Sequence, residues 1–487
     1  MASDIISLKG VTFSYKGSKR RALDGITLNV KQGECVAILG PTGAGKSTLA
    51  CVMNGTAPRF MDGSLAGDVT VDGLVPAKVG TAQMASRVGL VFGDPDTQLF
   101  GMTVEEDVAF GPANLGLGYE SIMERVGKSI GDMRLAGLER RAPHRLSGGQ
   151  KQATAIAGVY AMLPKIMVLD EPTSMLDPEG KARVFAIVRM LKEQLGVTVV
   201  LIEQEVDDIL TLADRVFVMR SGKFVLSGTP REVFGRVEEL RQAGVRVPQI
   251  VEFGTLIGAA ETPFTIEEAI SAIAPASAEE AVSGVTSAFA SVSEAANPAA
   301  APRASRAAQA DPVVEAVDVE FTYPGGARAL DGVNLAVGCG DFVAIVGQNG
   351  AGKTTLTRHF NGLLRPSSGD IRVLGRSAQG VPTIELCRHV GYVFQNPDEQ
   401  LFCTSVQEEL RFGPTNIGAD PGVTSQRVEE ILGDIGLTKY REVWPKYLTK
   451  GERQRLALAS VVAMDPDVLV VDEPTTGLDW VESLQIL

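Results

Sequence analysis

The chain has 487 residues, and 46 basic against 59 acidic side chains give it a formal net charge of −13. At about 150 residues per domain, this length predicts two to four domains, and 45% hydrophobic with 22% charged residues is typical of soluble globular proteins. The acidic balance argues against a chain-wide nucleic-acid-binding function, which needs a basic face, but leaves a local basic patch open.

The cysteines and the hydropathy of the chain indicate in which cellular compartment the protein is expected. The five cysteines are scattered and form no CxxC pair, which indicates reduced thiols in a cytosolic protein. The N-terminus has no charged start followed by an apolar run, so we expect no signal peptide. No stretch reaches about 18 apolar residues, so we expect no membrane span.

The first chemical motif follows a short apolar run, ECVAIL, that is typical of a buried parallel strand. The next residues read GPTGAGKS and fit the pattern GxxxxGK[ST], in which backbone N–H groups and a helix N-terminus cradle phosphates. In this motif the lysine reaches the terminal phosphates and the hydroxyl that follows it holds Mg²⁺. A glycine-rich turn that matches by chance is the alternative. The expected phosphate-binding residues are Gly40, Gly43, Gly45, Lys46, Ser47 and Thr48.

Two carboxylates follow the apolar run KIMVL. Asp170 ends this predicted strand, where its carboxylate can hold Mg²⁺ through water. Glu171 comes next and can polarise the attacking water as a catalytic residue. The alternative is that acidic residues at a strand end are merely solvated.

The same blocks recur in the second half of the chain, in the same order. Lys353 lies 307 residues after Lys46, and Asp472 lies 302 residues after Asp170. A repeated match at a nearly constant offset makes chance negligible for both motifs. The alternation of strand and helix patterns in each copy predicts an α/β fold with mostly parallel sheets. The second copy adds the expected phosphate-binding residues Gly347, Gly350, Gly352, Lys353, Thr354 and Thr355, the expected metal-binding residues Thr354 and Asp472, and the expected catalytic residue Glu473.

Composition between the copies suggests the domain boundaries. We expect a first phosphate-binding domain at 1–235, a small helical appendage at 236–273 with apolar periodicity, and an Ala-rich flexible linker at 274–312. The second domain spans 313–487 and stops soon after DEPTTGLD, where the first copy continues with further strands. We therefore expect this chain to be a truncated product or gene fragment, with its activity in doubt and with a sheet edge left exposed.

Residues 146–150 read LSGGQ, and with the two P-loops and DEPT blocks the chain resembles the ABC-type ATPases over nearly all of its length. The resemblance implies two P-loop NTPase domains that face each other head to tail. Each ATP is then held between the P-loop of one domain and the signature of the other, which in the first copy is Ser147, Gly148, Gly149 and Gln150. It also implies that Tyr15 and Tyr323 stack on adenine, with a core tyrosine as the alternative, and that Asp177 and Asp479 lie in the loop that communicates across the dimer.

Finer blocks resemble one subfamily. DPDTQLF and NPDEQLF, each followed by FGPxN, and VPQIVEF with PFTIEEAI are similar to the ATPases of energy-coupling-factor (ECF) importers of vitamins or transition-metal ions. This resemblance implies a peripheral protein at the cytoplasmic face of the cell membrane. Its partners are a multi-span membrane scaffold subunit and a separate substrate-binding membrane subunit, and it has no nucleic-acid partner.

The chain departs from the family pattern at three places. The family glutamine after the strand VGLVF or VGYVF is present as Gln395, a further catalytic and metal-contacting candidate, but the first copy has Gly93 there. The switch histidine of the family is Gln204 in the first copy and lies beyond Leu487 in the second. The second signature reads LTKGE at 448–452. All three departures fall on the composite site of the first P-loop, which predicts one weak or structural site and one hydrolytic site. Harmless drift is the alternative, because Glu171 is intact.

The leading interpretation is thus an ATP-hydrolysing subunit that energises an ECF-type importer, with ATP and Mg²⁺ as cofactors. A soluble tandem ABC protein acting on ribosomes or DNA, or an inactive fragment that binds nucleotide without turnover, are the alternatives. The Ala-rich linker is not notably basic, which speaks against the soluble protein.

Overall fold

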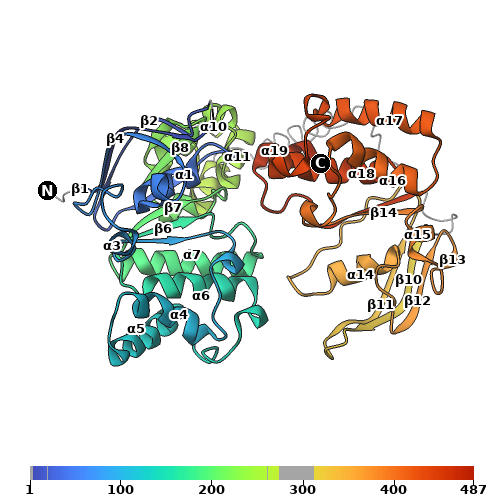
Figure 1. Ribbon diagram of the computed structural model, residues 1–487, viewed down its shortest axis with the longest axis horizontal. Coiled ribbons are helices and arrows are strands. Elements are labelled where there is room, and N and C mark those ends of the chain that lie inside the picture. Colours follow the sequence, from blue (N-terminus) through green and yellow to red (C-terminus); the bar gives the residue numbers. More distant parts are fainter. Residues whose placement is uncertain (1–3, 19, 260, 274–311, 487) are drawn as a thin grey trace. The chain divides into compact units, whose positions relative to one another are not determined.

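The computed structural model describes residues 4–18, 20–259, 261–273 and 312–486. The chain divides into two compact units, Met1–Pro298 with Asp479–Val481 and Ala299–Leu478 with Glu482–Leu487 (blue to green and yellow to red in Figure 1). Residues 274–311 of the predicted linker lie outside the described residues. No described helix has the length and the apolar character needed to cross a membrane.

Two sheets build the first unit. The smaller one is antiparallel in the order β2-β1-β4, and the larger one has the order β5-β6-β7-β3-β8-β9, parallel apart from the last pair. Because neighbouring strands of the larger sheet run parallel, the connections between them must cross over the sheet, and helices form these crossovers. The strands are β1 (Asp4–Tyr15), β2 (Leu23–Lys31), β3 (Cys35–Leu39), β4 (Gly63–Val71), β5 (Val88–Val91), β6 (Ile166–Asp170), β7 (Thr198–Ile202), β8 (Arg215–Arg220) and β9 (Lys223–Gly228).

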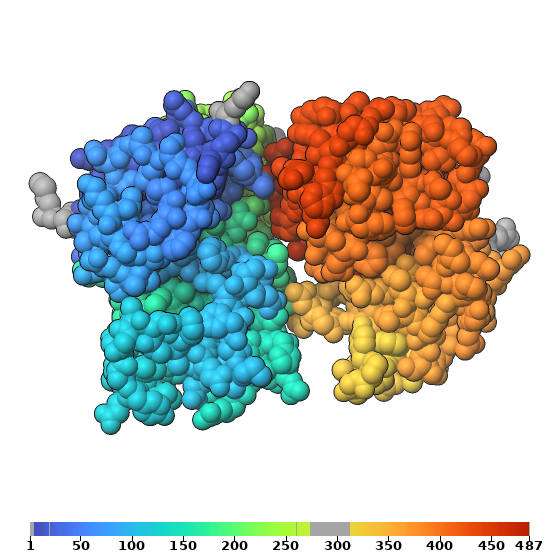
Figure 2. All heavy atoms as spheres, viewed as in Figure 1, coloured from blue at the N-terminus to red at the C-terminus, as the bar shows by residue number. Residues whose placement is uncertain are grey.

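Helices cover the larger sheet and continue past it into the region predicted as an appendage. Figure 2 shows the segment of α4 and α5 (cyan) at one end of the first unit, opposite the N-terminal strands (blue). The helices are α1 (Lys46–Asn54), α2 (Thr56–Arg59), α3 (Thr81–Ala85), α4 (Val104–Asn114), α5 (Tyr119–Asp132), α6 (Gly148–Tyr160), α7 (Pro178–Glu193), α8 (Ile209–Leu212), α9 (Pro230–Phe234), α10 (Val237–Ala243), α11 (Gln249–Leu256) and α12 (Ile266–Ile273).

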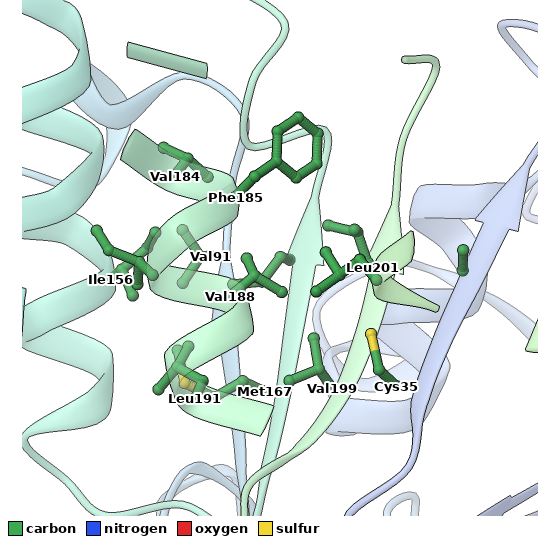
Figure 3. Packing of buried hydrophobic residues seen from close by; sticks show 14 of the residues in the cluster. Cys35, Val91, Ile156, Met167, Val184, Phe185, Val188, Leu191, Val199 and Leu201 are labelled. Atoms are coloured by element: carbon green, nitrogen blue, oxygen red, sulfur yellow. The ribbon is translucent and has the colours of Figure 1, made fainter. Parts of the chain in front are cut away.

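Alternation along the buried strands divides the core of the first unit into two layers. Val199 and Leu201 of β7 point to the layer formed with α6 and α7, whereas Val200 and Ile202 point to the layer formed with α1 and the antiparallel sheet. In Figure 3, Val188 of α7 lies against the β7 side chains. Burial on both faces explains why these strands read as continuous apolar runs.

The second unit repeats the antiparallel sheet in the order β11-β10-β12-β13, but its parallel sheet has only the pair β14-β15 among the described residues. The strands are β10 (Val314–Thr322), β11 (Arg328–Val337), β12 (Ser368–Val373), β13 (Arg376–Ser377), β14 (Val390–Val393) and β15 (Val468–Val471). The helices after residue 312 are α14 (Lys353–Phe360), α15 (Thr383–Leu386), α16 (Val406–Asn416), α17 (Pro421–Asp434), α18 (Lys450–Val462) and α19 (Trp480–Ile486).

One strand expected in the second unit does not form. DFVAIV at 341–346 is predicted as a buried parallel strand, yet these residues have no regular structure, and Phe342 is 96% exposed. The equivalent strand of the first unit, β3, is held between β7 and β8. No described segment of the second unit corresponds to these two neighbours, so the apolar run has nothing to pair with. The α/β fold is confirmed, with this difference between the units.

Candidate functional site

In the first unit the P-loop connects β3 to α1. Gly45 precedes α1 with φ 106°, and a Cβ there would lie 2.3 Å from the carbonyl oxygen of Ala22, so only glycine fits. Lys46 is 5% exposed, and its Nζ donates to the carbonyl oxygens of Gly40 (2.7 Å) and Pro41 (3.1 Å). The lysine therefore closes the loop that the phosphates of ATP are expected to enter.

Asp170 provides oxygen ligands beside this loop. It ends β6, it is 8% exposed, and its Oδ1 is buried with no hydrogen-bond partner. Burial raises the pKa of its carboxyl group, against the opposing effect of a hydrogen bond from Ser47. A buried carboxylate oxygen without a donor, next to a serine hydroxyl, is a set of hard oxygen ligands that fits Mg²⁺.

Glu171 adopts a left-handed backbone conformation with φ 52°, as its counterpart Glu473 does with φ 45°. Non-glycine residues rarely adopt this conformation, and it recurs at functional sites. The Oε1 of Glu171 lies 3.3 Å from Lys46 Nζ and accepts a hydrogen bond from Gln204 Nε2 at 2.9 Å. Lys46 of the P-loop and Gln204 of the segment after β7 therefore both contact the carboxylate of Glu171, which directly follows β6.

A buried acid behind this cluster was not expected from the sequence. Glu203 is 1% exposed and accepts hydrogen bonds from the backbone N–H and Oγ1 of Thr173 (3.1 and 2.7 Å) and from the backbone N–H of Gln204 (3.1 Å). Burial raises the pKa of its carboxyl group to about 7. A glutamate directly after the apolar run TVVLI was the only sequence signal.

The second unit forms the corresponding loop without a preceding strand. Lys353 Nζ donates to the carbonyl oxygens of Gly347 (2.8 Å) and Gln348 (3.0 Å), and Gly352 precedes α14 with φ 93°. Gly350 also has positive φ, at 82°, which matches 73° at Gly43 of the first loop. The two P-loops therefore share these lysine contacts and glycine turns, but they differ at their first glycine, where Gly40 has φ 148° and Gly347 has no positive φ.

Asp472 differs from Asp170 in its partners. Its Oδ1 accepts a hydrogen bond from Thr354 Oγ1 at 3.1 Å, and its Oδ2 accepts one from Tyr392 Oη at 2.9 Å. Burial raises the pKa of Tyr392 to about 12, so the phenol is protonated and donates. Leu90 occupies the equivalent position of the first unit, and the sequence analysis did not single out either residue.

Gln395 is the third member of the second site. Its Nε2 donates to Glu473 Oε2 at 2.7 Å, and Lys353 Nζ lies 4.0 Å from Glu473 Oε1. The predicted catalytic residues of this unit, Gln395 and Glu473, are therefore in direct contact.

The two candidate adenine-stacking tyrosines have matching surroundings. Tyr15 and Tyr323 are 37% and 38% exposed. Their hydroxyl groups are 2.8 and 3.0 Å from the Oγ1 atoms of Thr48 and Thr355, respectively. Half-exposed rings anchored to the P-loop helix suit a stacking role better than that of a core tyrosine.

The signature residues begin α6 and α18 in the same way. Ser147 and Gln150 form a reciprocal capping box, and Thr449 and Glu452 form the same box in the second unit. Gly148 is the first residue of α6, and a Cβ on Gly149 would lie 2.8 Å from Gly180 Cα. In the described part of the first unit, no hydrogen bond joins residues 147–150 to the P-loop of that unit.

Comparisons with known proteins indicate the family of the chain. The ABC transporter family model matches residues 23–174 and 330–476. A putative ABC transporter ATP-binding protein of Caldanaerobacter subterraneus subsp. tengcongensis is 40% identical over 486 residues, 99% of this chain and 84% of the relative. One of Methanosarcina mazei is 39% identical over 480 residues, 98% of this chain and 80% of the relative. Among solved structures, cbiO1 of Clostridium perfringens, described as part of the ABC transporter complex cbiONQ, is 36% identical and aligns with 51% of this chain and 97% of its own, with a TM-score of 0.44.

The family match falls on the two halves that carry the P-loops and the DEPT blocks, and it covers more than half of the chain. ATP binding and hydrolysis are the shared activity of ABC ATPases, and the cluster of lysine, aspartate and glutamate in each unit is consistent with it. The chain belongs to the ABC transporter family, as an ATP-binding protein with two ATPase units.

Proposed function

We propose that the chain energises an ECF-type importer of a vitamin or a transition-metal ion. ATP binding draws the two ATPase domains together, hydrolysis releases them, and a multi-span membrane scaffold converts the motion into transport. The substrate is bound by a separate membrane subunit. In this proposal the protein lies peripherally at the cytoplasmic face of the membrane.

The observation that carries the proposal is a pair of exposed aromatic rings in each unit. Phe100 of the QLF block and Phe110 of the FGPxN block are in edge-to-face contact with ring centroids 4.3 Å apart. Phe402 and Phe412 repeat the contact at 4.6 Å. The four rings are 45–62% exposed, although burying a phenylalanine is worth about 2 kcal/mol. Exposed rings kept in the same geometry twice are typical of a docking surface.

Buried carboxylates hold each pair in place. Asp107 Oδ1 accepts hydrogen bonds from the backbone N–H groups of Phe100 (3.0 Å) and Gly101 (2.9 Å). Glu409 Oε2 does the same for Phe402 (2.9 Å) and Cys403 (2.7 Å). Each turn is fixed before any partner binds, and a preorganised surface loses little entropy on docking.

Ion pairs connect this surface to the signature helices. Lys151 of α6 lies 2.8 Å from Asp96, and Arg453 of α18 lies 2.9 Å from Asp398. Both acids belong to the turn that precedes the QLF block. A displacement of that turn by a docked helix is therefore passed to the start of the signature helix.

For the chemistry, we propose that each ATP is held between the P-loop of one domain and the signature of the other. Lys46 and Lys353 bind the terminal phosphates, Tyr15 and Tyr323 stack on adenine, and Glu171 and Glu473 take up a proton from the attacking water. Mg²⁺, held by Ser47 with Asp170 and by Thr354 with Asp472 and Gln395, supplies charge neutralisation at the phosphates. The site of the second P-loop, with Gln395 and LSGGQ, hydrolyses faster than the site of the first.

Co-expression with a multi-span membrane protein encoded beside this chain tests the proposal. We expect the pair to co-purify, and we expect Phe100→Ser with Phe402→Ser to lower membrane retention and uptake by about 10-fold or more. Phe60→Ser, at an aromatic side chain that is 69% exposed outside the docking surface, serves as the control and keeps both. Binding of the chain to ribosomes with no membrane partner would contradict the importer.

A further inference from the structure

Two aromatic side chains lie just before the signature of the second unit, outside the ATP site described above. Trp444 precedes the short 3₁₀ turn Pro445–Tyr447, and Tyr447 ends it. The two rings are 39% and 79% exposed and are in edge-to-face contact, with centroids 5.7 Å apart. The ammonium group of Lys446 lies 4.9 Å from the centre of the Trp444 ring. These three residues form one exposed group, the Trp444 cluster.

The fold does not require these rings, because the first unit builds the same turn without them. The turn there is Pro143–Arg145, and Ala142 precedes it where the second unit has Trp444. Arg145 takes the position of Tyr447. In both turns the leucine that follows donates to the carbonyl oxygen of the buried proline at 3.0 Å. The rings are therefore additions to a turn that forms without them, which argues for a binding role rather than a packing role.

The polar groups of the Trp444 cluster have no partner in the protein. In the part of the chain that the structure describes, the indole N–H of Trp444, the hydroxyl group of Tyr447 and the ammonium group of Lys446 form no hydrogen bond or ion pair. Lys439, which lies 4.7 Å from the ring centre of Tyr440, has no acidic partner there either. Amphipathic rings with free polar groups are enriched at the headgroup level of membranes, and lysines near them bind anionic lipids.

The number of free cations distinguishes a lipid surface from a nucleic acid as the ligand. The guanidinium group of Arg441 is already held by both carboxylate oxygens of Glu429. Lys439 and Lys446 remain, and two cations are few for a nucleic-acid site, which typically makes about six to ten phosphate contacts. Two cations beside two amphipathic rings suit anionic lipid headgroups, because rings and charges contribute together to binding at the interface.

The Trp444 cluster lies beside the docking surface of the second unit. The carbonyl oxygen of Val443, next to Trp444, accepts a hydrogen bond at 3.1 Å from the backbone N–H of Val406, the first residue of α16. The turn before α16 carries Phe402, one of the exposed rings of the docking surface. The cluster is therefore on the side of the second unit that the proposed function turns towards the membrane.

We propose that Trp444, Lys446 and Tyr447 insert into the headgroup layer of a membrane that contains anionic lipids. This contact holds the second unit at the membrane without a protein partner. The first unit has no aromatic residue at the two equivalent positions, so the anchor belongs to the second unit. The inference rests on the proposed function only for the orientation of the unit, because the chemistry of the cluster is independent of any scaffold.

The fluorescence of Trp444 tests the inference directly. The chain has two tryptophans, and Trp480→Phe leaves Trp444 as the single emitter. With vesicles of phosphatidylcholine and phosphatidylglycerol in equal parts, we expect the emission of the purified full chain to shift to shorter wavelength. We also expect quenching by lipids with brominated acyl chains, because an interfacial ring lies next to them. An emission that vesicles leave unchanged would overturn the inference.

Sedimentation with vesicles compares matched variants. Trp444→Ala, which copies the first unit, combined with Tyr447→Ser should weaken binding by about 10-fold. Lys439→Gln with Lys446→Gln should weaken binding to anionic vesicles by at least about fivefold and leave binding to pure phosphatidylcholine unchanged. Phe60→Ser, at an exposed ring of the first unit, is the control and keeps the parent affinity. Equal binding of the parent and the Trp444 and Tyr447 double variant would contradict the anchor.

Two further outcomes would also overturn the inference. If the double variant weakens binding of a single-stranded oligonucleotide but not of vesicles, the rings stack on bases. If it weakens co-purification with the membrane scaffold but not vesicle binding, the rings belong to the protein docking surface. The vesicle assays contain no scaffold, so their failure removes the anchor alone, whereas failed co-purification contradicts the importer alone.

Discussion

The two units share the residues of the phosphate loop but differ in what supports it. In the first unit β3 enters the loop between two paired strands, and the side chain of Lys46 is 5% exposed. In the second unit the preceding residues 341–346 are unpaired, and the side chain of Lys353 is 19% exposed. Even so, each lysine Nζ donates to two carbonyl oxygens of its own loop. The distances are 2.7 and 3.1 Å for Lys46 and 2.8 and 3.0 Å for Lys353. The loop conformation is therefore set locally by its glycines and its helix, whereas burial of the lysine comes from the sheet.

The candidate catalytic side chains differ in a second way. In the first unit Glu171 accepts a hydrogen bond from Gln204, and in the second unit Glu473 accepts one from Gln395. Of the two candidate metal-binding aspartates, Asp170 and Asp472, only Asp472 accepts a hydrogen bond from a phenol. The sheet therefore buries the P-loop lysine more completely in the first unit. The hydrogen bonds to the candidate metal-binding aspartate are more complete in the second unit. The following predictions separate these two contributions.

The largest difference is expected in turnover. Glu473→Gln should lower steady-state ATPase activity by on the order of 100-fold, because a general base contributes about 10²–10⁴ to the rate. Glu171→Gln should lower it by less than about twofold, since the site that we propose to be slower would contribute little to the total. Phosphate release at saturating ATP measures both. Equal losses would remove the distinction between the two sites.

A pH dependence is expected for the first unit because of Glu203. Its pKa is about 7 in the fold against an ordinary value of 4.5, so the unfolded chain loses this proton first as the pH rises. The contribution of Glu203 to stability is full below its unfolded pKa and is lost as the pH rises to about 7. It amounts to at most about 3 kcal/mol of unfolding free energy. Urea denaturation between pH 4.5 and 8 should show this decline.

The control for this effect is Glu203→Gln, which cannot ionise. We expect it to flatten the pH dependence, although its amide now faces the N–H of Gln204 and lowers stability at every pH. If the unfolding free energy of the variant falls with pH as steeply as that of the parent, the titrating group is another one in this unit, such as Asp170, whose pKa is also raised by burial.

A smaller difference is expected in metal binding. Tyr392 holds one oxygen of Asp472, and partners that orient a metal ligand typically contribute about 10-fold or more to affinity. Tyr392→Phe should therefore weaken Mn²⁺ binding with ADP by about 10-fold. Electron paramagnetic resonance of an Asp170→Ala chain isolates the second site. Unchanged affinity would make the phenol a packing residue only.

Whether a feature could be predicted from the sequence depends on how far apart along the chain its residues lie. Both P-loops and the strand that ends at Asp170 depend on local pattern or on the repeat, and these were predicted, whereas the contact between the phenylalanines of the QLF and FGPxN blocks was not. The contact of Gln204 with Glu171 spans 33 residues, and the bond of Tyr392 to Asp472 spans 80, so no local pattern reports them. The run at 341–346 has the composition of a buried strand, but a strand also needs neighbours, which composition does not supply.

The smallest effect concerns the two signatures. Glu452 in LTKGE departs from the glutamine of LSGGQ by a charge, yet both side chains accept from the backbone N–H of the helix cap, with Glu452 at 2.9 Å and Gln150 at 3.1 Å. Glu452→Gln should therefore keep the capping box and leave the melting temperature unchanged within error. Glu452→Ala and Gln150→Ala should each cost about 1 kcal/mol, because each leaves one cap donor without its partner. Thermal unfolding of the three variants checks this. If Glu452→Gln also raises single-turnover hydrolysis at the first P-loop, the charge contributes to the slower turnover proposed for that site; if it does not, the proposed difference is assigned to Gly93 and Gln204 of the first unit.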